Sequence, residues 1–120
     1  MAQHNELGNQ GEALAIAELQ RKGYAILAKN WQYQKAEIDI IAQNSEFVVA
    51  VEVKTRSTKA FGNPQDFVNP QKIKRLVTAM DHYVISNNIT QEVRFDIVAI
   101  TKDQSRFELE HLEGAFYSFD

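Results

Sequence analysis

The 120-residue sequence contains no cysteine. Disulfide bonds, thiolate catalysis and cysteine-ligated zinc or iron–sulfur sites are therefore excluded. No apolar run approaches the roughly 20 residues that cross a bilayer, and the polar segment Met1–Gln10 lacks the apolar core of a secretory signal. Neither a glycine-rich phosphate loop nor a Ser-His-Asp arrangement is visible, and the three histidines share no metal-ligand spacing. We expect a cytoplasmic protein that does not associate with membranes.

Basic residues are also in the minority, at 13 against 16 acidic ones, so the formal net charge is −3. The basic residues are nevertheless concentrated in one segment. Residues 54–75 contain six basic side chains and one acidic side chain, a local charge of +5. An acidic protein can still present one basic face to a nucleic acid. The alternative is that these side chains only solvate a loop and a helix.

Apolar periodicity predicts the order helix, three strands, helix, two strands. The helices are expected over 5–22 and 70–87, with Gly23 ending the first and Asn69-Pro70 starting the second. The strands are expected over Tyr24–Gln34, Glu37–Gln43, Phe47–Arg56, Val93–Ile100 and Arg106–Leu112, with a loop over Ser57–Asn69. A helical crossover between strands predicts an α/β fold, a mixed sheet flanked by helices, in a single domain over residues 1–120.

The second and third strands read as a hairpin whose turn is centred on Asn44-Ser45. An even-length turn there would set Asp39 opposite Ala50. Asp39 and Glu52 would then be diagonal neighbours on one face, roughly 7–8 Å apart at Cα. An odd-length turn would place them on opposite faces.

Two carboxylates among apolar neighbours repel one another and lose hydration, and a divalent cation would remove both costs. Oxygen ligands favour Mg²⁺ or Mn²⁺, so Asp39 and Glu52 are the candidate metal ligands. Lys54 would stabilise charge on a phosphate, and Glu12, on the inward side of the first helix, would be a further ligand or a supporting acceptor. The plainer interpretation is that Glu52 and Lys54 form a same-face ion pair of little energy.

These residues resemble the second half of the PD-(D/E)xK nuclease motif, as Asp39 followed by Glu52-Val53-Lys54. The closer resemblance is to the YraN family of small bacterial proteins, similar to archaeal Holliday junction resolvases. Its pattern is matched by Gly11-Glu12, Asn30, residues 37–41, residues 51–56, Lys72 and residues 94–96. Ala36 stands where that family usually has glycine, which matters if the backbone there requires positive φ.

The resemblance implies a restriction-endonuclease-like αβββαβ core with the site on its central hairpin. It implies metal ligation by Asp39 and Glu52, a catalytic role for Lys54 and an auxiliary acid at Glu12. It also implies a DNA endonuclease, acting on branched or junction DNA as a homodimer.

Arg56 and Lys72 are the expected phosphate contacts. Trp31 and Tyr33 either stack on an exposed base or belong to the core, and Arg94 and Asp96 either form an ion pair or join the basic face. Two alternatives to the nuclease stay open, a nucleic-acid-binding accessory protein that does not cleave and a scaffold that binds no nucleic acid.

Overall fold

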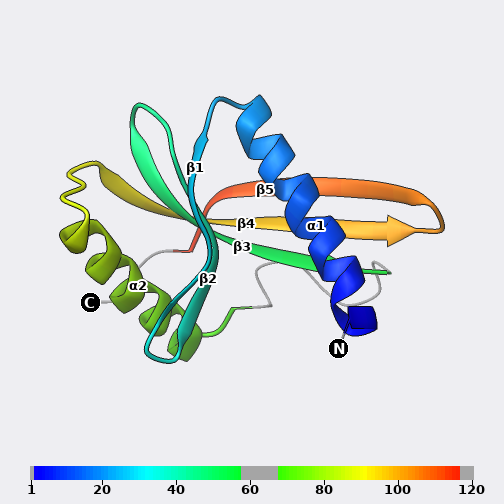
Figure 1. The fold of residues 1–120 in the computed structure, drawn as a ribbon, viewed down its shortest axis with the longest axis horizontal. Helices are drawn as coiled ribbons and strands as arrows, with labels where there is room; N and C mark the ends of the chain where they lie inside the picture. Colours follow the sequence, from blue (N-terminus) through cyan, green and yellow to red (C-terminus); the bar gives the residue numbers. More distant parts are fainter. Residues whose placement is uncertain (1, 58–67, 117–120) are drawn as a thin grey trace.

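The computed structural model describes residues 2–57 and 68–116, with side chains from Glu6 onward. Its elements follow the predicted order, αβββαββ (Figure 1). They are α1 (Ala2–Arg21), β1 (Ala25–Tyr33), β2 (Ala36–Gln43), β3 (Phe47–Arg56), α2 (Pro70–Ser86), β4 (Glu92–Asp103) and β5 (Arg106–Phe116). Most of the expected loop Ser57–Asn69 lies outside the described residues. Within them, no helix is both long enough and apolar enough to cross a membrane.

The five strands form one mixed sheet in the order β1-β2-β3-β4-β5. Neighbouring strands are antiparallel except β3 and β4, which run parallel because α2 crosses over between them. The α/β class and the mixed sheet are therefore confirmed, and the first six elements provide a restriction-endonuclease-like αβββαβ core. β5 extends this core by one strand beside β4.

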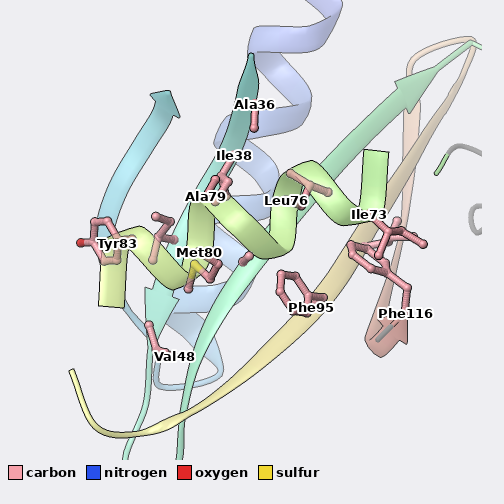
Figure 2. Close-up of a cluster of buried hydrophobic side chains, with 13 residues drawn as sticks. Ala36, Ile38, Val48, Ile73, Leu76, Ala79, Met80, Tyr83, Phe95 and Phe116 are labelled. Carbon is pink, nitrogen blue, oxygen red and sulfur yellow. The ribbon is translucent and has the colours of Figure 1, made fainter. Parts of the chain in front are cut away.

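Each face of the sheet packs against one helix, because side chains alternate along each strand. On one face, Ala15 and Leu19 of α1 join a cluster with Val49 and Val51 of β3. On the other face, Val48 and Ala50 of β3 lie in a cluster with five side chains of α2. Figure 2 shows this second cluster, with Ile73, Leu76, Ala79, Met80 and Tyr83 of α2 lying along the sheet. Both helices thus sit in fixed positions relative to β3.

Local capping fixes where α2 begins. Asn69 is the N-cap, its Oδ1 accepts a 2.9 Å hydrogen bond from the backbone N–H of Lys72, and Pro70 occupies the first turn. This confirms the predicted start and places the first turn of α2 beside β3. Ala36 is the first residue of β2, and the positive φ falls on Gln34 instead, at 56°. Alanine at position 36 therefore carries no backbone strain.

α1 lies close to β3 at Gly11. A Cβ built on Gly11 would lie 1.8 Å from Oγ1 of Thr55, far inside any van der Waals contact. Glycine is therefore required by space at this position, and Gly8, which has nothing near its would-be Cβ, has no such requirement. The contact holds Glu12, the next residue of α1, near the end of β3.

The predicted pairing of the β2–β3 hairpin was wrong by two residues. Ala50 pairs with Ile41, not with Asp39. The reason is the Asn44 side chain, whose Oδ1 accepts hydrogen bonds from the N–H groups of Glu46 and Phe47 and moves the loop to Ser45-Glu46. Because the shift is even, Asp39 and Glu52 remain on one face.

Candidate functional site

Main-chain pairing between β2 and β3 ends at Ile40 and Val51. The same register places Asp39 beside Glu52, one step beyond that last pair. β2 continues to pair with β1 past this point, as far as Ala36 with Tyr33. The hairpin therefore forks at Asp39 and Glu52, and both residues line a cavity beside the first turn of α2.

At the fork, side chains replace the missing main-chain pairing. Asp39 Oδ2 accepts a 2.8 Å hydrogen bond from the backbone N–H of Val53. Glu52 Oε1 lies 3.2 Å from Nζ of Lys72 on α2. Glu52 Oε2 is buried and has no hydrogen-bond partner. A buried carboxylate oxygen without a partner destabilises the folded protein, so binding of a proton or a cation at this atom would be stabilising.

The pKa values of both carboxyl groups, Asp39 and Glu52, are raised by their buried surroundings. Burial and, to a smaller extent, the charge of Asp39 raise the pKa of Glu52 to about 7, against a lowering effect of Lys72. Burial likewise raises the pKa of Asp39 to about 6, against the lowering effect of the Val53 N–H. Two neighbouring acids that resist ionisation are typical of catalytic and metal-binding sites.

The fork opens into a cavity of about 460 Å³ between β2, β3 and the first turn of α2. Its charged lining residues are Lys35, Glu37, Asp39, Glu52, Lys54, Lys72 and Arg75. Four of the predicted site residues, Asp39, Glu52, Lys54 and Lys72, are thus brought together. Lys54 is exposed at the cavity, and Arg56, two residues further along β3, does not line it.

Glu12 approaches the fork from the α1 side. Its Oε1 accepts a 3.4 Å hydrogen bond from Nδ2 of Asn30, and its negative charge contributes to the raised pKa of Asp39. Asn30 stands opposite Asp39 between two paired positions of β1 and β2, and has a φ of 48°. Glu12 does not line the cavity, so it is close enough to act on Asp39 electrostatically without sharing the cavity wall.

The residues present fit a divalent cation held by two carboxylates. Within residues 2–57 and 68–116, no group of three or more His, Asp or Glu side chains is arranged to hold a metal ion. Magnesium commonly takes one or two carboxylates and completes its shell with water and phosphate oxygens. Asp39 and Glu52, with the unpartnered Oε2, would provide such a pair.

Residues 11–100 match the profile described as "Uncharacterised protein family UPF0102". The chain belongs to the UPF0102 family. A UPF0102 protein of Flavobacterium psychrophilum is 58% identical over 99% of this chain and 100% of its own length. UPF0102 proteins of Christiangramia forsetii and Phocaeicola vulgatus are 54% and 43% identical, over 99% and 98% of this chain and 100% and 97% of their own lengths. The predicted membership of this family, also called YraN, is thereby confirmed.

A second polar cluster of this UPF0102 protein lies on the α1 face. Asp96 is fully buried, and Arg94 donates two 2.9 Å hydrogen bonds to its carboxylate. His111 Nε2 lies 2.7 Å from Asp96, and Lys22 Nζ lies 2.8 Å from His111 Nδ1, so the proton is assigned to Nε2. Of the two alternatives for Arg94 and Asp96, the ion pair is confirmed.

The bulge in β5 belongs to the same cluster. Phe95 pairs with Phe116 and Ile97 with Leu112, so three residues of β5 face one of β4. The middle one, Gly114, has a φ of 58° and donates its N–H to Asp96 over 3.0 Å. Within the described part of the chain, the side-chain hydrogen bonds of Asp96 thus all involve residues of β4 and β5, which indicates a structural role for this cluster.

Sequence reasoning named Lys72 as a phosphate contact but did not predict its ion pair with Glu52. Its proximity to Glu52 depends on how α2 docks after a connection that has no periodicity of its own, and the capping signal at Asn69 fixes only where the helix starts. It also missed the extent of the aromatic group at β1. Trp31 and Tyr33 lie beside His82 and Tyr83 of α2, with a centroid distance of 4.2 Å between Tyr33 and His82.

Proposed function

We propose that this UPF0102 protein is a metal-dependent endonuclease that hydrolyses phosphodiester bonds of DNA. The observation that carries the proposal is the buried, unpartnered Oε2 of Glu52 beside Asp39, at the wall of an open cavity lined by basic side chains. Acidic residues in such surroundings are costly for folding and are typical of functional sites. The resemblance to PD-(D/E)xK nucleases supports the same activity.

In this proposal Asp39 and Glu52 hold Mg²⁺ or Mn²⁺ and are both ionised when they do so. The ion, when bound, lowers the pKa of a water and polarises a phosphoryl group. Lys54 projects from the exposed end of β3 into the same cavity, where its ammonium group stabilises negative charge developing on the phosphate. Glu12 keeps a negative charge near Asp39 and orients the site from the α1 side.

The Lys72–Glu52 pair also supports a second candidate function. Lys72 already compensates part of the Glu52 charge at 3.2 Å, as it would in a protein that binds nucleic acid without cleaving it. In that case the basic residues around the cavity, together with Arg56 further along β3, would contact phosphates, and Lys72 would do so while paired with Glu52. Such binding would weaken steeply with salt.

Cleavage of labelled branched, flapped and single-stranded DNA in Mg²⁺ and in Mn²⁺ separates the two candidates. We expect wild-type protein to cleave, and Asp39→Asn, Glu52→Gln and Lys54→Ala to lose at least a hundredfold in rate, as the loss of one preorganised charged group typically does. Glu110→Gln is the matched control, because Glu110 is an exposed acid on β5 away from the cavity.

Cleavage by the Asp39→Asn and Glu52→Gln variants at the wild-type rate would refute the assigned site. Salt-dependent DNA binding without turnover in either metal would favour the accessory function.

A further inference from the structure

A second cavity adjoins the candidate site along the β1–β2 hairpin. It has a volume of about 550 Å³ and is lined by Tyr33, Gln34, Lys35, Ala36, Lys74, Arg75 and Thr78. Lys35, Ala36 and Arg75 line both cavities. The two cavities are therefore contiguous, and a chain that places a phosphate beside Asp39 and Glu52 can extend into the second one.

The second cavity combines positive charge with an aromatic wall. Lys35 and Lys74 are exposed, and Arg75 is shared with the candidate site. Among the residues that the structure describes, no acidic side chain lines this cavity. Lys35 reaches it from a two-residue turn made possible by the positive φ of Gln34. Three cations facing one hollow favour an anionic ligand.

Tyr33, the aromatic residue of this wall, belongs to a stack that runs from the edge strand β1 onto α2. Tyr33 and His82 are stacked at 4.2 Å with an interplanar angle of 20°, and Trp31 is parallel to Tyr33 within 5° at a centroid distance of 6.2 Å. Tyr83 closes the inner end of the group against Trp31. Tyr33 is only partly buried and forms part of the cavity wall. An aromatic surface beside cations is the combination that binds a nucleobase and its phosphate.

We propose that this second cavity, the Tyr33 cavity, binds an unpaired nucleotide of the nucleic acid whose neighbouring phosphate enters the Asp39–Glu52 site. The inference rests on the proposed function and narrows its substrate class. In a duplex both faces of a base are covered by neighbouring bases, so only a single-stranded or extruded nucleotide can offer a face to Tyr33. The substrate is therefore DNA with unpaired nucleotides next to the cleaved bond.

The test uses binding in chelator, so that it does not depend on cleavage. Trp31 is the only tryptophan and adjoins Tyr33, which makes its fluorescence a local reporter. The full chain is titrated at low salt with a thymidine oligonucleotide, a blunt duplex of equal length and an abasic oligonucleotide of equal length. We expect the thymidine strand to change Trp31 fluorescence and to bind more tightly than both others.

Tyr33→Ala should weaken binding of the thymidine strand by about five- to a hundredfold, the range for loss of one stacked base, and should change abasic binding little. Tyr33→Phe should retain the affinity. Phe107→Ala is the aromatic control, because Phe107 is an exposed ring on β5. Lys35→Ala should weaken the binding of all three oligonucleotides. Arg106→Ala is its matched charge control and should leave the binding unchanged.

Equal affinity of wild-type protein for the thymidine and abasic strands would overturn the proposal, and this comparison requires no variant to fold. Failure of the proposed function looks different. A protein that discriminates between these ligands in chelator but never cleaves in Mg²⁺ or Mn²⁺ retains the nucleotide site without nuclease activity. A protein that cleaves but does not discriminate retains the activity without this site.

Discussion

Lys72 Nζ lies 3.2 Å from Oε1 of Glu52, whereas Oε2 of the same carboxylate is buried without a partner. The two oxygens of Glu52 therefore have different environments. One is compensated by a side chain of α2, and the other depends on a proton, or on a cation if one binds. This asymmetry gives the metal-free protein a measurable energetic signature.

The first prediction concerns Glu52 and pH. Its pKa in the folded protein, about 7, is raised above the ordinary value of 4.5. Protonated Glu52 therefore contributes fully to the free energy of unfolding below about pH 4. This contribution is lost as the pH rises through about 7. In chelator at pH 8, Glu52→Gln should raise the free energy of unfolding by roughly 1–3 kcal/mol. At pH 4 the two proteins should be equally stable.

Urea denaturation at both pH values measures this difference, with Glu110→Gln as the control that should match wild type throughout. A Glu52→Gln variant less stable than wild type at pH 8 would contradict the stated environment of Oε2.

The second prediction separates two roles of Asp39. Its Oδ2 accepts the Val53 N–H at 2.8 Å, an interaction that an asparagine can reproduce and an alanine cannot. Asp39→Ala should therefore be less stable than Asp39→Asn by about 1–3 kcal/mol, the cost of a buried donor left unpaired. Thermal and urea unfolding of the two variants in chelator provide the comparison. Equal stability would show that the Val53 N–H finds another acceptor.

The third prediction concerns the contact between α1 and β3. Gly11→Ala should lower the free energy of unfolding by roughly 1–3 kcal/mol, the usual cost of overpacking, because its Cβ would lie 1.8 Å from Thr55 Oγ1. Adding Thr55→Ala should restore part of the loss, since it removes that oxygen. Gly8→Ala is the matched control on the same helix and should be tolerated. A Gly11→Ala protein as stable as wild type would mean that α1 can shift freely.

The fourth prediction concerns Asp96, which should respond to pH in the opposite direction from Glu52. Burial alone would raise the pKa of Asp96, but hydrogen bonds from His111, Arg94 and the Gly114 N–H outweigh it and lower the pKa. The contribution of Asp96 to the free energy of unfolding is present above about pH 4 and is lost as the pH falls through its lowered pKa.

Asp96→Asn should cost roughly 3–5 kcal/mol at neutral pH, as for a buried ion pair that loses one partner. It should also flatten the acid limb of the stability profile. Replacing Arg94 by Met in the same protein should recover part of the loss, because no unpaired cation then remains. Acid titrations followed by circular dichroism measure all three proteins, and an unchanged acid limb in Asp96→Asn would refute the assignment.

Much of the fold could be predicted because local signals agreed with one another. β3 was located to the residue, Phe47–Arg56, since its apolar run is bounded by a turn on one side and turns polar at the other. The start of α2 was equally clear, because Asn69 and Pro70 carry both the capping side chain and the fixed φ.

The site was predictable only in part. The predicted hairpin register was wrong by two residues, but Asp39 and Glu52 still share one face because the shift is even. The register itself depends on the Asn44 side chain, which accepts hydrogen bonds from two N–H groups. That choice between two neighbouring turns is made by one side chain and leaves no periodic signal. The place of Lys72 and the stack of Tyr33 on His82 depend on tertiary docking of α2, which sequence spacing does not encode.

The fork of the hairpin has a consequence for comparing members of the UPF0102 family. Asp39 accepts a hydrogen bond from a main-chain N–H, so even a relative without the proposed activity would be stabilised by an acid or an amide at this position. Glu52 Oε2 accepts no such hydrogen bond. Under the proposed function, a relative with glutamine at position 52 and aspartate at position 39 would keep its fold and lose a metal ligand, so position 52 would distinguish active from inactive members.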